Sequence, residues 1–147
     1  MKRVLKSRQS GSTAVEFALV LLIFLTFLLA ITDFSRMLFT WNAATEATRA
    51  GARYAVVCDN TTRQALVLAK MQAMLPQISN ASVVWDPPGC TSATCEGVTV
   101  SIVGLNYQWI SPIAGLTALA PIPMPTFQTY LSREIMGMDP NDATICS

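Results

Sequence analysis

The chain has 147 residues, of which 52% are apolar and only 13% charged, and it contains no histidine. The lack of histidine excludes a Ser-His-Asp triad, a Cys-His pair and histidine-based metal sites. The sequence therefore predicts no enzyme, no cofactor and no bound metal. Four of its ten cations lie within the first eight residues, and the remainder carries six cations against nine acids. That balance leaves no basic surface for nucleic acid.

The N-terminus consists of a basic leader followed by a long apolar run. Residues 17–31 are apolar except for Thr26, which predicts a segment that enters a membrane. The leader carries four cations and no acid: Lys2, Arg3, Lys6 and Arg8. Because such cations stay in the cytoplasm, the chain beyond the apolar run is expected on the far side. Glu16 is the anomaly, since a charged residue costs about 2.5–3.5 kcal/mol at mid-membrane and less near an interface. Glu16 therefore either has a partner or lies near the cytoplasmic headgroups.

The helical pattern continues beyond the apolar run, and no proline precedes Pro76. This predicts one helix over residues 13–57, apolar on all sides in its first half and amphipathic in its second. Small residues recur at every fourth position of the second half: Ala43, Ala47, Gly51 and Ala55. Because Gly51 costs about 1 kcal/mol relative to alanine in a helix, we expect tight packing there, against the chain's own sheet or against a neighbouring helix.

The remainder of the chain predicts a second, short helix followed by strands. Asn60 or Thr61 can cap this helix and Pro76 ends it. Its expected apolar face consists of Ala65, Leu68, Met71 and Leu75. The period then changes to two, which predicts strands at 81–85, from 98 to about 109, and at 127–135. Strands that follow helices indicate an α+β fold with a small antiparallel sheet, on which the long helix packs by its second half.

Residues 110–125 are apolar but contain Pro112, Pro121, Pro123 and Pro125. Prolines remove backbone donors, so this stretch is not a second membrane helix. We expect an ordered apolar loop. It either covers the sheet or docks another subunit or the bilayer surface.

All four cysteines follow the apolar run, as expected for disulfides formed in an oxidising compartment. Four cysteines allow three pairings. We favour Cys90–Cys95, because Pro87, Pro88 and Gly89 precede it in a polar loop that can close on itself, which leaves Cys58–Cys146. The nearby acids Asp139 and Asp142 lack the ligand count of a calcium site and are expected to be solvated.

Four residues around the start of the apolar run have the same spacing as a known processing signal. Gly11, Ser12, Glu16 and Phe17 resemble the class III signal of type IV pilins, in which prepilin peptidase cuts after glycine and leaves glutamate at the fifth mature position. The Glu-Phe pair and the short leader are similar to the tight-adherence (Tad/Flp) branch, and specifically to its TadE-like minor pilins or pseudopilins. The resemblance extends over roughly residues 8–57.

The resemblance implies a processing site between Gly11 and Ser12, with possible N-methylation of Ser12 left open by the sequence. It also implies that Ser12, Glu16 and Phe17 serve helix pairing during assembly. Ser12 and Glu16 share a helix face at i, i+4 spacing, so the new amino group and the carboxylate can neutralise each other.

The expected organisation is a leader at 1–11, a transmembrane half-helix at 12–32 and a pilin-like domain at 33–147 in the periplasm or outside the cell. The resemblance implies a minor pilin or pseudopilin of a type IVb pilus, with an initiating, capping or adaptor role. Its partners would be prepilin peptidase, other pilins, the inner-membrane assembly platform and the inner membrane itself. The chain departs from the major pilins of these systems, which resemble a bare helix and usually carry tyrosine after the glutamate.

Two other interpretations remain. The chain could be an uncut, single-span periplasmic binding or accessory protein whose leader is only a cytoplasmic flank. An ordinary secretory signal is less favoured, because Glu16 interrupts its apolar region and no small-x-small cleavage site stands at residues 28–31. The first residue of the mature chain distinguishes these interpretations.

Overall fold

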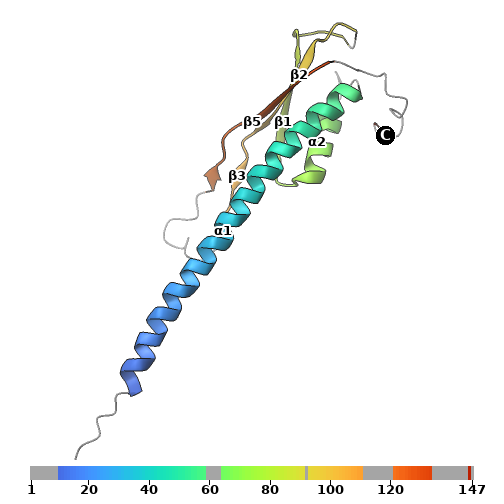
Figure 1. The fold of residues 1–147 in the computed structure, drawn as a ribbon. Coiled ribbons are helices and arrows are strands. Elements are labelled where there is room, and N and C mark those ends of the chain that lie inside the picture. Colours follow the sequence, from blue (N-terminus) through green and yellow to red (C-terminus); the bar gives the residue numbers. More distant parts are fainter. Residues whose placement is uncertain (1–9, 59–63, 92, 111–120, 134–145, 147) are drawn as a thin grey trace, which may run out of the picture.

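One helix of 48 residues, α1 (Ser10–Val57), runs through most of the length of the molecule, and every other element packs beside its C-terminal half (Figure 1). The computed structural model describes residues 10–58, 64–91, 93–110, 121–133 and 146. The other elements are α2 (Gln64–Met74), β1 (Asn80–Asp86), β2 (Gly97–Val103), β3 (Asn106–Tyr107), β4 (Ile122–Pro123) and β5 (Phe127–Ser132). The predicted long helix is confirmed, and it begins a few residues earlier than the sequence pattern indicated.

The sheet is antiparallel throughout and has the strand order β1-β2-β5. At its centre Val100 lies opposite Val83 on one side and Thr129 on the other. α1 packs on β2 and β5, and α2 packs on β1. The fold is thus α+β, with two helices against one antiparallel sheet, as the sequence predicted.

Gly51 lies where α1, α2 and β2 meet. A Cβ atom at this position would lie 2.8 Å from Met71 Sδ, 2.9 Å from Met71 Cγ and 3.4 Å from Val100 Cγ1. Met71 and Val100 are completely buried, as are Ala47 and Ala55 of the same small-residue strip. The expected tight packing at Gly51 is confirmed, and the strip faces the chain's own α2 and sheet.

Several boundaries differ from the sequence pattern. β2 ends at Val103, well before residue 109, because Gly104 adopts a left-handed φ of 72° and turns the chain. Asn106 and Tyr107 then pair with Ile122 and Pro123, so the segment expected to be a plain loop contains a short strand.

In α2 the buried face contains Val67 rather than Ala65, which is exposed. The remaining predictions here concern the caps Asn60 and Thr61, residues 111–120, the end of the last strand, and the pair Asp139 and Asp142. They lie outside the described residues.

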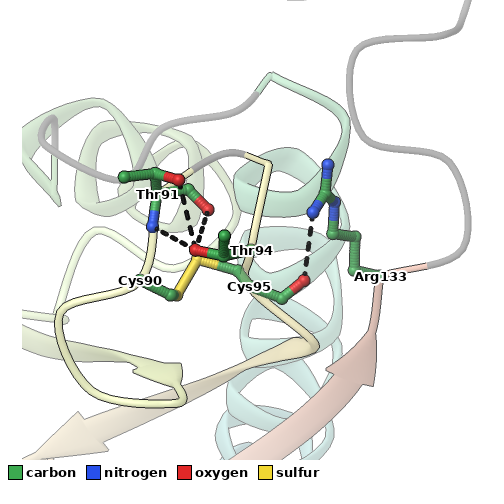
Figure 2. The surroundings of a disulfide bond; sticks show 5 residues. All are labelled: Cys90, Thr91, Thr94, Cys95 and Arg133. Carbon is green, nitrogen blue, oxygen red and sulfur yellow. Dashed lines mark hydrogen bonds between the residues drawn. A yellow bond between two sulfur atoms is a disulfide. The ribbon is translucent and has the colours of Figure 1, made fainter.

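Two disulfides stabilise the end of the domain that is remote from the exposed half of α1. Cys58, just past the end of α1, is bonded to Cys146, and their Cα atoms are 5.4 Å apart. Cys90 is bonded to Cys95 across the β1–β2 connection (Figure 2). These are the pairs that the sequence favoured.

The loop of the Cys90–Cys95 disulfide closes on itself as expected. Cys90 N donates to Pro87 O at 3.1 Å, and Gly89 supplies the positive φ of 77° that this turn needs. Cys95 N then donates to Thr91 O at 3.0 Å. Arg133 directly follows β5, and its guanidinium donates to Cys95 O at 3.2 Å, so the loop is also held to the sheet's other edge (Figure 2).

Candidate functional site

The residues that the sequence marked for processing and pairing all lie in the first two turns of α1. Gly11, Ser12, Glu16 and Phe17 are exposed, and Phe17 has 67% of its surface accessible. The helix passes through Gly11 without a break, and a Cβ atom at Gly11 would meet nothing within 4 Å. Ser12 and Glu16 are four residues apart on continuous helix and therefore share a face.

Residues 11–32 form a largely apolar rod that the rest of the described chain leaves uncovered. All are exposed except Thr26, which is half-buried. An 18-residue window of this helix has a mean hydropathy of 2.8, and none of it is buried within the protein. A core helix of similar composition would be covered by its own domain, whereas this one projects away from the sheet (Figure 1). By length and composition, α1 is able to cross a membrane once.

The hydroxyl groups of Thr26 and Thr32 are satisfied by the helix itself. Thr26 Oγ1 donates to Ile23 O at 2.6 Å, and Thr32 Oγ1 donates to Leu28 O at 2.8 Å. Such internal bonds are what polar side chains need in a medium without water. Glu16 differs, because within the residues that the structure describes it forms no hydrogen bond or ion pair. The rod therefore contains one carboxylate that needs an external partner.

The rod meets the domain at Asp33, whose side chain is 4% exposed. Tyr107 Oη donates to Asp33 O at 2.9 Å, and Ile110 N donates to Asp33 Oδ1 at 3.2 Å. Arg36 Nη1 lies 3.7 Å from the same carboxylate oxygen. These contacts fix the lower edge of the domain to the helix within two residues of the end of the apolar run.

Burial raises the pKa of the Tyr107 phenol above its ordinary value of 10.0, while the Arg36 guanidinium opposes this shift and the Asp33 carboxylate adds to it. The phenol is therefore a hydrogen-bond donor throughout the neutral range. Its bond to the main chain of α1 persists wherever the domain is folded at ordinary pH.

The burial of Asp33 was not predicted, although the sequence contains a signal for it. The buried positions of α1 include Thr40, Ala44 and Ala47, at three- and four-residue spacing. Extended back by two turns, the same spacing reaches Asp33. A buried polar side chain on a core-facing stripe requires hydrogen-bond partners, and Ile110 N donates to the Asp33 carboxylate while Tyr107 Oη binds the main-chain oxygen of Asp33.

The described residues contain no cluster of three or more histidine, cysteine, aspartate or glutamate side chains able to hold a metal ion. The features that remain are the exposed Glu16 carboxylate, the open position of Gly11 and the two disulfides. The arrangement combines an uncovered apolar helix, able to cross a membrane, at one end with a disulfide-stabilised α+β domain at the other.

Comparison with known protein families finds one family that part of the chain is similar to. A family model described as TadE-like protein matches residues 11–53, which lie entirely within α1. The match agrees, over this part of the chain, with the resemblance to TadE-like proteins that was inferred from the sequence. No curated protein and no solved structure shows detectable similarity to the chain.

Proposed function

We propose that the chain is a minor pilin or pseudopilin that takes part in assembling a Tad/Flp type IVb pilus, after prepilin peptidase cuts it between Gly11 and Ser12. The observation that carries this proposal is the exposed Glu16 carboxylate, which has no partner within the described residues and lies on an otherwise apolar rod one turn beyond Ser12. Its position is that of the glutamate in the class III signal that residues 11–17 resemble.

The geometry at Gly11 suits cleavage of the peptide bond between Gly11 and Ser12. Gly11 has no side chain and open space around its Cα, so a protease can approach the following peptide bond closely. Glycine also weakens the helix by about 1 kcal/mol relative to alanine, which eases the local unwinding that hydrolysis requires. Water adds to the Gly11 carbonyl, and the Ser12 nitrogen leaves as an amine that takes up a proton. The leader departs with its four cations.

The cut creates a charge that complements Glu16. The new ammonium group at Ser12 and the Glu16 carboxylate are one turn apart, and charged groups at this spacing attract each other. Attraction is stronger in lipid than in water because the dielectric constant is lower. The pair forms within one subunit or between two neighbours. In the second case it sets the register of adjacent helices, which is the role we assign to Ser12, Glu16 and Phe17.

We place the N-terminus in the cytoplasm and the domain in the periplasm. The leader cations favour this orientation, and the two disulfides suit an oxidising compartment. The α+β domain exceeds what a filament shaft needs, so we assign an initiating, capping or adaptor role. The absence of histidine from the sequence supports a structural rather than a catalytic domain.

The experiment compares Glu16→Leu with Glu46→Leu in cells that form Tad pili. Glu46 is an exposed acid on the same helix, at the level of the domain, where it forms a surface ion pair with Arg49. We expect both variants to insert in the membrane, but only Glu16→Leu to lose pilus assembly and co-purification with other pilins. Normal piliation in Glu16→Leu would contradict the pairing role and favour an uncut accessory protein.

A further inference from the structure

The junction between rod and domain contains a polar cavity in addition to the buried Asp33. The cavity has a volume of about 420 Å³. It opens between α1, β3 and Gln77 in the connection after α2. It is lined by one guanidinium, three carboxamides and an indole, from Arg36, Gln77, Asn106, Gln108 and Trp109. Such donors suit an oxyanion with polar substituents.

The guanidinium is available on the outer side of this cavity. The Arg36 side chain is 45% exposed, whereas the Asp33 side chain behind it is 4% exposed. Their closest atoms are 3.7 Å apart, beyond hydrogen-bond length, and Asp33 Oδ1 already accepts from Ile110 N at 3.2 Å. Arg36 therefore retains donors for a second anion.

The position of the cavity along α1 sets its depth in a bilayer. A hydrocarbon core of about 30 Å corresponds to about 20 helical residues, and residues 14–33 satisfy this requirement. The outer boundary of the hydrocarbon then falls at Asp33, where the domain is attached. Arg36 lies about 4.5 Å further along the axis, inside a headgroup layer of about 5–8 Å.

Apolar and aromatic side chains at the cavity and next to Asp33 are typical of a membrane-facing edge. Ile110 is 68% exposed and Phe34 is 55% exposed, and both lie beside the buried Asp33. Trp109 packs edge-on against Tyr107, with ring centroids 5.7 Å apart. Tryptophan and tyrosine are enriched at this depth because their rings are amphipathic.

We propose that this junction cavity binds the phosphate headgroup of an anionic phospholipid in the leaflet next to the domain, with Arg36 as the phosphate ligand. The inference rests on the membrane placement of α1 in the proposed function. With this lipid bound, the domain lies on the bilayer surface before assembly. A subunit that leaves the membrane for a pilus has to release this lipid.

The test uses the full-length protein reconstituted in vesicles of phosphatidylethanolamine and phosphatidylglycerol in a 3:1 ratio. Lipids that remain bound after purification in detergent are counted by native mass spectrometry. We expect the wild-type protein to retain phosphatidylglycerol, and Arg36→Gln to bind it roughly ten- to a hundredfold more weakly, the loss typical of charge-assisted hydrogen bonds. Arg53→Gln is the matched control, because it removes the same charge from an exposed site on the same helix.

A second measurement does not depend on how well the Arg36 variant folds. Vesicles with a nitroxide on the lipid headgroup should quench tryptophan fluorescence strongly, and Trp109→Phe should remove much more of the quenching than Trp85→Phe, since Trp85 is 8% exposed in the core. Equal effects of the two substitutions would overturn the proposed depth.

Three further outcomes would also overturn the inference: undiminished lipid retention in Arg36→Gln, an equal loss in Arg53→Gln, or displacement of the lipid by millimolar inorganic phosphate. The last result would indicate a site for free phosphate, and cross-linking of the cavity to another pilin would indicate a protein partner. Failure of the wild-type protein to stay inserted under alkaline extraction would contradict the proposed function instead.

Discussion

The contact at Gly51 gives the sharpest test of the packing. In Gly51→Ala the added methyl group gains about 1 kcal/mol of helix propensity. It also enters space held by Met71 Sδ at 2.8 Å and Met71 Cγ at 2.9 Å, both in a completely buried side chain. Overpacking of this kind costs about 1–3 kcal/mol, so the clash outweighs the propensity. We expect a net loss of about 1 kcal/mol of folding free energy.

The effect of Gly51→Ala on the folding free energy should change from destabilising to stabilising once the Met71 side chain is truncated. Met71→Ala alone costs about 2–5 kcal/mol because it leaves a cavity. In that background the methyl group of Gly51→Ala has room, so it should stabilise by up to about 1 kcal/mol. The double-mutant cycle therefore predicts a coupling of about 1–3 kcal/mol between the two positions.

Equilibrium unfolding of the full chain in detergent micelles, followed by tryptophan fluorescence, measures these differences. Gly11→Ala is the matched control, since it adds the same methyl group to the same helix where nothing lies within 4 Å. It should leave the unfolding of the domain unchanged. If Gly51→Ala stabilised both backgrounds equally, α1 and α2 would not be in tight contact and the reasoning would be refuted.

The remaining predictions concern the disulfides and the junction. Loss of the disulfide at Cys58, which closes 88 residues, should cost about 4–5 kcal/mol, whereas loss of the disulfide at Cys90, which closes 5 residues, should cost about 2 kcal/mol. Denaturant midpoints of the two double-serine variants check this order, and equal midpoints would contradict it. Tyr107→Phe should cost about 0.5–1.5 kcal/mol, because it removes the hydrogen bond to Asp33 O. Since burial raises the pKa of Tyr107, the stabilisation from its proton is complete below the ordinary pKa of 10.0 and is lost as the pH rises through the raised value. An alkaline loss of stability that persists unchanged in Tyr107→Phe would exclude this phenol as its cause.

The sequence predicted the long helix and the sheet because their patterns are local. The small-residue strip from Ala43 to Ala55 has a four-residue spacing that keeps its members on one face of a helix. Val98, Val100 and Ile102 alternate with period two, and all three are buried in β2. The pairing of Cys90 with Cys95 followed from a short loop with turn residues.

The junction could not be predicted in the same way because it depends on long-range contacts. The bond from Tyr107 to Asp33 joins residues 74 positions apart, and no local period reports it. The end of β2 depended on the conformation of Gly104, which the apolar pattern does not encode. Residues of the processing signal were found through resemblance, since an isolated Glu16 shows only that a partner is needed.

The proposed pilin function requires cleavage of the chain between Gly11 and Ser12. The intact mass of the protein isolated from membranes, with and without an active prepilin peptidase, measures this cut. We expect a chain that begins at Ser12 when the peptidase is active and one that retains Met1 when it is absent. A chain that begins at Met1 in both cases, or near residue 32, would contradict the central claim.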